Sequence, residues 1–327
     1  MSGKLRIGII GCGDFLRLRA ADLLSSRQVE VKLLYSPVNS ANAERYAEIF
    51  GVKAADSPEA IINDPEIDVV CVFVPPFVRK EYVLAAAKAG KQIVATKPLA
   101  ADLSDAREMT EAVEQAGVRC GVIYRRTNNP VIEAYKEIFS GGEFGKLALY
   151  KQDWLHHYPT WNRWATDPKK NGGPFMDAML HNLNAARYLM GRRVVGRAFF
   201  SDDHTHSLAC DDTQFLKVDF EQGASAHLFI TWAAELAVYD SAKNDREHID
   251  QCFMVTDQGW LFRNEIREGK AVITATRNGL EKDFPVIPFE ETFFDRYAKE
   301  IKNRDILPAD LPDIREAYED LRILLEN

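Results

Sequence analysis

Apolar residues in the first 124 positions alternate between short unbroken runs and longer segments with helical spacing. Runs such as 67–74 are typical of parallel strands that are buried on both faces. The repeated strand–helix order predicts an α/β fold with a doubly wound parallel sheet and right-handed crossovers. We expect strands at 5–10, 31–35, 67–74, 92–95 and 119–124, and helices at 14–25, 41–50, 80–89 and 104–116.

After Tyr124 the pattern changes to longer segments in which apolar and polar residues alternate. Such alternation is typical of an open, mainly antiparallel sheet with one face covered. The expected domains are therefore 1–124, which holds the parallel sheet, and 125–327, an α+β domain. We expect strands at 147–154, 197–201, 213–220, 224–231, 252–255, 260–263 and 271–275, and helices at 131–139, 174–190, 291–302 and 312–326.

The first expected strand ends in Gly11-x-Gly13, directly before the first expected helix. Gly11 permits a tight turn, and Gly13 lets a phosphate approach the backbone. The amides of Asp14, Phe15 and Leu16 at the helix start can then bind a pyrophosphate. The usual third glycine or alanine is Leu16 here, so the fingerprint is incomplete and a purely structural turn is the alternative. The position of the motif within the alternating pattern favours dinucleotide binding.

Ser36 stands at the end of the second expected strand, where an NAD enzyme usually places a carboxylate against the ribose hydroxyls. A carboxylate there would repel the 2′-phosphate of NADP, so its absence permits NADP. Pro37 follows in place of the arginine that would select this phosphate. We expect NAD or NADP as cofactor, with NADP slightly favoured; an ordinary loop is the alternative.

Ligands of parallel sheets bind at the carboxyl ends of the strands, which places Pro75, Thr96 and Lys97 beside the expected cofactor. Lys97 follows its strand almost directly, and Pro98 helps to fix the turn because it lacks an amide hydrogen. A buried ammonium loses proton affinity, so Lys97 can hydrogen-bond or exchange a proton with a substrate hydroxyl. A lysine in a surface loop is the alternative interpretation.

A second informative stretch begins at Gly172-Gly173-Pro174 and continues to Asp177 and His181. Pro174 suits the first turn of a helix, and a spacing of four places Asp177 and His181 on one helix face. An imidazole can accept a proton as hydride leaves the same carbon, and a carboxylate can orient it or the substrate. The structural alternative, a helix-start aspartate and a core histidine, is disfavoured by the upstream nucleotide motif and lysine.

Residues 154–164 are dense in aromatic and polar side chains. Trp161 and Trp164 can stack on the C–H faces of sugar rings, while His156 and Arg163 can bind hydroxyls. Tyr124, at the end of the last strand of the first half, is a further expected substrate contact. An aromatic core or an oligomer contact is the alternative.

Together these residues resemble the Gfo/Idh/MocA family of NAD(P)-dependent oxidoreductases over essentially the whole chain. The resemblance rests on Gly11-x-Gly13, the Pro75-Pro76 turn, Lys97-Pro98-Leu99, and Gly172-Gly173 followed by Asp177 and His181. It implies an N-terminal Rossmann domain and a C-terminal α/β domain whose open sheet often mediates oligomers.

The resemblance also implies hydride transfer between the nicotinamide and a secondary alcohol or ketone of a sugar, glycoside or cyclitol. Lys97 would polarise the reacting oxygen, Asp177 would orient the substrate and His181 would be the acid/base. Arg79 and Thr96 would contact the cofactor, although the family commonly has His and Glu at these positions. A tightly retained cofactor that cycles within one catalytic sequence stays open, as does a non-catalytic dinucleotide-sensing or regulatory protein.

The composition and net charge of the chain limit which partners and which cellular compartment we expect. A net charge of −8 without a basic stripe argues against nucleic acid as a partner. The apolar stretches are too short for a signal peptide or a membrane span. The five cysteines are odd in number and lack zinc-type spacing, which fits reduced thiols in the cytoplasm. We interpret His156-His157 and residues 202–206 as polar segments rather than metal sites, and expect a homodimer or homotetramer.

Overall fold

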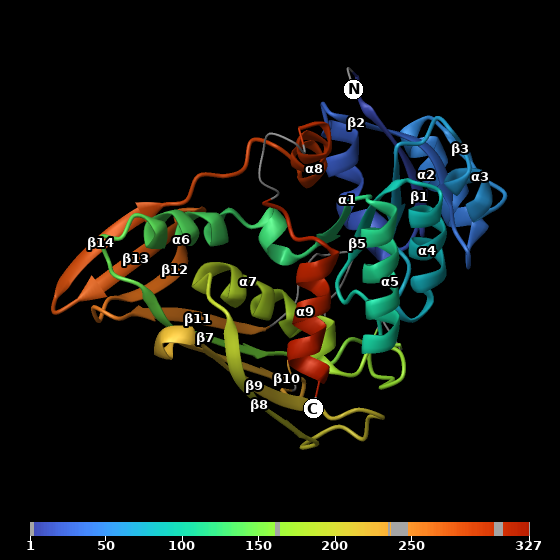
Figure 1. Ribbon diagram of the computed structural model, residues 1–327. Helices are drawn as coiled ribbons and strands as arrows, with labels where there is room; N and C mark the ends of the chain where they lie inside the picture. Colours follow the sequence, from blue (N-terminus) through green and yellow to red (C-terminus); the bar gives the residue numbers. More distant parts are fainter. Residues whose placement is uncertain (1–2, 161–163, 235, 237–247, 304–309, 327) are drawn as a thin grey trace. The chain divides into compact units, whose positions relative to one another are not determined.

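The computed structural model describes residues 3–160, 164–234, 236, 248–303 and 310–326 (Figure 1). The chain forms two compact units, Met1–Asn128 with Phe289–Asn327, and Asn129–Pro288. The predicted domains differ from these units at the C-terminal end, because the last 39 residues pack with the first unit. Among the residues described, no helix has the length and apolar character needed to cross a bilayer.

The first unit is a six-stranded parallel sheet with the strand order β3-β2-β1-β4-β5-β6, which confirms the predicted doubly wound fold. Its strands are β1 (Leu5–Ile10), β2 (Val29–Tyr35), β3 (Lys53–Ala54), β4 (Val69–Val72), β5 (Gln92–Thr96) and β6 (Cys120–Ile123). Its helices are α1 (Asp14–Ser25), α2 (Ser40–Phe50), α3 (Pro58–Ile62), α4 (Lys80–Lys88), α5 (Leu103–Ala116), α8 (Phe293–Lys302) and α9 (Ile314–Leu325). Residues of α1, α2 and α8 share one core cluster on the sheet.

Helix α8 carries an aromatic face into this core. Phe293, Phe294 and Tyr297 are at most 1% exposed. The Tyr297 hydroxyl donates a hydrogen bond to the Ile93 carbonyl at 2.6 Å. Its ring fills the space beside Gly121, where a Cβ atom would come within 2.7 Å of the ring. This packing explains why a segment distant in sequence belongs to the first unit.

Asp295 joins the start of α8 to the turn that follows α1. Its buried carboxylate accepts hydrogen bonds from the Ser26 hydroxyl (2.6 Å), the Gln28 amide (3.0 Å) and the Thr292 hydroxyl (2.9 Å). Burial by itself would raise the pKa of Asp295. The hydrogen bonds from Ser26, Thr292 and the backbone outweigh burial and hold this pKa below its usual range.

We expect Asp295→Asn to lower the free energy of unfolding by about 2–3 kcal/mol at neutral pH. The native pKa lies below the unfolded value of about 3.9, so the carboxylate stabilises the fold fully above that value. This stabilisation is lost as the pH falls through the native pKa. Urea unfolding of both proteins at several pH values measures the effect. A difference that stays constant into the acid range would contradict the prediction.

The second unit is an eight-stranded sheet with the strand order β14-β13-β12-β11-β7-β10-β9-β8. Neighbouring strands are antiparallel except β7 and β10, which confirms the prediction of an open, mainly antiparallel sheet. Helices α6 (Pro130–Ser140) and α7 (Leu180–Met190) lie along one face of it (Figure 1). The strands are β7 (Leu147–Leu155), β8 (Val194–Asp202), β9 (Thr213–Phe220), β10 (Ser225–Thr231), β11 (Ile249–Thr256), β12 (Leu261–Arg267), β13 (Lys270–Arg277) and β14 (Leu280–Pro285).

Candidate functional site

The turn after β1 has the geometry that a bound pyrophosphate requires. Gly11 has φ +106°, and a Cβ atom there would come within 2.7 Å of the Phe73 carbonyl, so only glycine fits. Gly13 caps α1, and a Cβ atom there would meet no atom within 4 Å. Gly13 itself has no side chain to cap this helix. The first amides of a helix that lacks a side-chain cap suit an anionic group.

The predicted cofactor contacts around this turn differ in their burial and in their contacts. Leu16 is fully buried, so it can serve a nucleotide only through its backbone amide. The Phe15 ring packs edge-on against Phe73, with ring centroids 4.9 Å apart, and Asp14 is exposed. At the end of β2, the half-buried Ser36 accepts a hydrogen bond from the Asn39 amide at 3.4 Å.

Lys97 directly follows β5 and therefore lies at the same sheet edge as the β1 turn. It is half-buried, whereas the other residues from Ile93 to Ala100, all described, are buried. The peptide bond between Lys97 and Pro98 is cis. Pro75, three residues beyond β4 at this edge, is also half-buried. The structure thus brings together the predicted lysine, the proline turn and the dinucleotide turn within one unit.

Arg79 and Thr96 lie at this edge, but their side chains point into the protein. Arg79 is 2% exposed, and its guanidinium donates hydrogen bonds to the Val74 carbonyl and the Thr96 hydroxyl at 2.7 Å each. Thr96 is 6% exposed. Both side chains are buried and bonded to each other, which leaves only backbone atoms of Arg79 and Thr96 for the expected cofactor contacts.

The segment with Asp177 and His181 belongs to the second unit. The predicted single α-helix is a π-helical turn over Phe175–Met179 followed by α7. Asp177 lies inside the π turn, where hydrogen bonds join residues five apart, so the α-helical argument for a shared face does not apply. From Gly173 to Ala186, a fully described stretch, Asp177 and His181 alone are half-buried, while the rest are buried. Asp177 and His181 are therefore partly accessible within an otherwise buried segment, and their catalytic roles stay predictions.

A side chain from the sheet anchors the start of this π turn. The Gln214 amide oxygen on β9 accepts a hydrogen bond from the Phe175 backbone amide at 2.7 Å. Gln214 is buried, and it is 39 residues from its partner. Gln214 could not be found from the sequence, since a single glutamine in a strand carries no local signal for such a contact.

The structure describes three of the five predicted substrate contacts. Tyr124 and His156 are 1% and 3% exposed, so neither offers an accessible side chain. Trp164 is half-buried. Trp161 and Arg163 lie outside the described residues.

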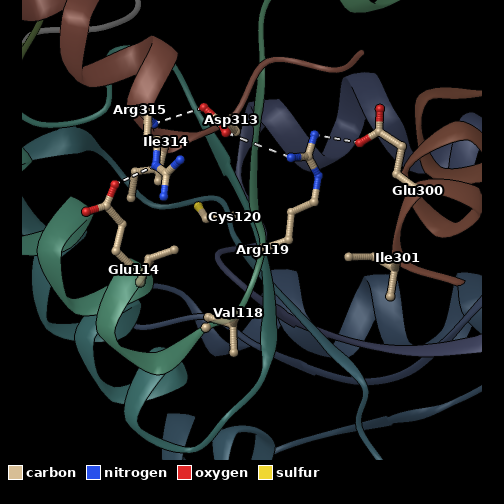
Figure 2. Close-up of a pocket in the computed structure, with 11 residues that line it drawn as sticks. Glu114, Val118, Arg119, Cys120, Glu300, Ile301, Asp313, Ile314 and Arg315 are labelled. Atoms are coloured by element: carbon tan, nitrogen blue, oxygen red, sulfur yellow. Dashed lines mark hydrogen bonds and ion pairs between the residues drawn. The ribbon is translucent and has the colours of Figure 1, made fainter. Parts of the chain in front are cut away.

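A pocket of about 300 Å³ lies at the opposite, amino end of β6 (Figure 2). Its charged side chains face one another: Arg119 pairs with Glu300 at 2.5 Å, and Arg315 pairs with Glu114 at 2.5 Å. Because its cations are matched by its own carboxylates and it is distant from the carboxyl edge, we assign this pocket to the scaffold.

Comparison with known proteins agrees with the fold and the nucleotide turn. A model described as the oxidoreductase family with NAD-binding Rossmann fold matches residues 5–124, and the GFO/IDH/MocA C-terminal domain matches residues 132–245. These matches cover more than half of the chain and define an oxidoreductase with an NAD-binding unit. The protein belongs to the Gfo/Idh/MocA family, as its motifs predicted.

Similar proteins include scyllo-inositol 2-dehydrogenase (NAD(+)) of Bacillus subtilis strain 168, which is 25% identical over 93% of this chain and 86% of that protein. Myo-inositol 2-dehydrogenase of Thermotoga maritima is 27% identical over 91% of this chain and 86% of its own length. The crystal structure of an aldose-aldose oxidoreductase from Caulobacter crescentus has the same fold, with a TM-score of 0.83 at 19% identity. The similarity covers 98% of this chain and 95% of that one.

Proposed function

We propose that this protein transfers hydride between a nicotinamide cofactor and a secondary alcohol or ketone of a sugar, glycoside or cyclitol. The observation that carries the proposal is the shared sheet edge of Gly11, Gly13 and Lys97. At this edge, the turn at Gly13 leaves room for a pyrophosphate at the start of α1. The half-buried Lys97 follows β5, which is separated from β1 only by β4. The inositol dehydrogenases to which the chain is similar support a polyol as substrate.

The nicotinamide, when bound, supplies or accepts the hydride. The amides at the start of α1 and the turn at Gly13 would hold its pyrophosphate. In the oxidation direction, the His181 imidazole takes the hydroxyl proton while the Lys97 ammonium donates a hydrogen bond to the same oxygen. Asp177 orients the imidazole or a neighbouring hydroxyl. In the reduction direction, His181 returns the proton.

For the cofactor, NADP is slightly preferred over NAD in this proposal. The end of β2 presents the Ser36 hydroxyl in place of the carboxylate that usually binds the ribose of NAD. Titration with NADH and NADPH would decide between the two cofactors. The expected result is a lower Kd for NADPH, and a lower Kd for NADH would contradict this preference.

The direct test is turnover with a panel of inositols, aldoses and glycosides, followed by the change in nicotinamide absorbance. Oxidation of at least one polyol with either cofactor is the expected result. Nucleotide binding without turnover of any compound, in both reaction directions, would favour a dinucleotide-sensing protein instead. Nucleotide that stays bound through gel filtration would favour a tightly retained cofactor.

We also propose that the sheet face opposite α6 and α7 joins two copies of the chain. Phe215, Phe229 and Ile249 lie on it around a shallow hollow, together with the ion-paired Lys151 and Asp153. Mixed apolar and paired charged groups suit a self-complementary two-fold contact.

Replacing Phe229 by glutamate is expected to convert the dimer or tetramer to a smaller species, because a charge would be buried at the contact. Light scattering after gel filtration measures the mass. The matched control is Ile287→Glu, at a residue that is 80% exposed outside this hollow. An unchanged mass for Phe229→Glu, or a monomeric parent protein, would contradict the proposed contact.

A further inference from the structure

A buried cation lies between the carboxyl ends of β4 and β5. Besides its contacts to Val74 and the Thr96 hydroxyl, Arg79 uses its other terminal nitrogen for three carbonyls of one loop. It donates hydrogen bonds to the carbonyls of Thr96 (2.6 Å), Leu99 (3.0 Å) and Pro98. One guanidinium group therefore holds the whole loop that contains the proposed catalytic lysine.

Among the residues that the structure describes, dipoles rather than an anion balance the charge of Arg79. All five hydrogen bonds that the structure gives it end on carbonyl or hydroxyl oxygens. Burial lowers the pKa of Arg79 to about 9, which still leaves it charged at neutral pH. Moving a guanidinium out of water without a carboxylate partner is unfavourable. Stability alone therefore does not account for an arginine at this position.

We propose that Arg79 is a positioning residue for Lys97. It binds the carbonyls on both sides of Lys97, those of Thr96 and Pro98, and so fixes the backbone from which the ammonium extends. Its bond to the Val74 carbonyl ties this loop to the end of β4, next to β1 and its dinucleotide turn. This inference rests on the proposed function, because it assumes that Lys97 contacts the substrate oxygen.

The geometry requires arginine in particular. A guanidinium is a rigid planar group with several donors, and it can bind the Val74 carbonyl, just beyond β4, and the Thr96 carbonyl at the end of β5 at once. A lysine at position 79 keeps the charge but carries its three donors on one nitrogen. It would leave buried carbonyls unpaired and let the loop shift. A displacement of about 1 Å at a reacting group can lower the rate about 100-fold.

The test uses Arg79→Lys and Arg79→Ala in the full-length protein, with the polyol that the wild-type protein oxidises. We expect kcat to fall about 100-fold in both variants, while the Kd for the nucleotide stays unchanged. Millimolar guanidinium chloride should restore much of the kcat of Arg79→Ala, because the free ion can occupy the vacated site. Sodium chloride at equal ionic strength should not. The rates are measured at a temperature at which Arg79→Ala is fully folded, so that a gain in stability alone does not raise kcat.

Arg119→Met is the matched control. Arg119 is also largely buried and donates to a carbonyl, that of Leu311 (2.9 Å), but it lies at the amino edge of the sheet (Figure 2). Its variant should lose thermal stability and keep its kcat, and guanidinium should have no effect on that rate.

The inference is overturned if Arg79→Lys keeps a kcat close to that of the wild type, or if guanidinium raises Arg79→Ala no more than sodium chloride does. If Arg79→Ala does not fold, Arg79→Lys decides by its kcat and nucleotide Kd. If Lys97→Met is fully active, the proposed function and this inference both fail. If Lys97→Met is inactive and Arg79→Lys is fully active, only the positioning role fails.

Discussion

Replacing Lys97 by methionine is expected to lower kcat about 100- to 1,000-fold, and His181→Ala about 100- to 10,000-fold. Methionine keeps the length of the lysine side chain but removes the donor that would stabilise the developing alkoxide. Alanine at 181 removes the group that would take the hydroxyl proton. Neither change touches the turn at Gly11–Gly13, so the nucleotide Kd should stay close to that of the wild type.

Steady-state kinetics and nucleotide titration measure these effects, and substrate deuterated at the reacting carbon adds a further readout. If slow proton transfer accompanies hydride transfer in His181→Ala, the chemical step limits turnover and the isotope effect on kcat should rise. Lys91→Met is the matched lysine control. Its ammonium binds the carbonyls of Asp64 (2.6 Å) and Ile67 (2.8 Å) at the amino edge of the sheet. Unchanged turnover in either site variant would remove that residue from the mechanism.

A fragment of residues 1–128 is expected not to fold, although it contains all six strands of the first sheet. It lacks Phe293, Phe294 and Tyr297, which are buried in the same core as β1 and α1. Removing one large aromatic side chain from a core costs about 3–5 kcal/mol. Three such losses approach or exceed a typical total stability of about 5–15 kcal/mol.

The same fragment joined to residues 289–327 by a flexible Gly/Ser linker should fold and unfold cooperatively. Circular dichroism and thermal unfolding compare the two proteins. Within the joined protein, Tyr297→Ala should lower the melting temperature strongly, because it removes both the ring beside Gly121 and the bond to the Ile93 carbonyl. A cooperative transition in the fragment 1–128 alone would contradict the unit boundaries.

Local pattern was sufficient for most elements. The predicted strand 5–10 and helix 14–25 coincide with β1 and α1, and the predicted strand 213–220 coincides with β9. The missed elements lack such a pattern. β3 has two residues and α3 has five, too few to show a period. β14 is a mostly exposed, polar strand at the sheet edge. Its sequence shows no alternation of apolar and polar residues, and only its pairing with β13 defines it as a strand.

The candidate site divides in the same way. The positions of Gly11, Gly13 and Lys97 at the carboxyl edge were predicted from sequence because each lies within three residues of the end of a recognisable buried strand. The sequence also placed Arg79 and Thr96 at this edge, but it did not show that their side chains are buried and bonded to each other. Which way a side chain points at the end of a strand depends on carbonyls contributed by other segments, such as Val74.

By itself, the sequence determined the order of strands and helices, the two sheet types and the chemistry-bearing residues at the strand ends. These features depend on periodicity and on neighbours a few positions away. Only the tertiary structure decided that 289–327 completes the first core, that a π turn precedes α7, and that Arg79 binds the loop of Lys97. Each of these depends on packing or hydrogen bonds between segments far apart in the chain, for which a linear pattern has no signal.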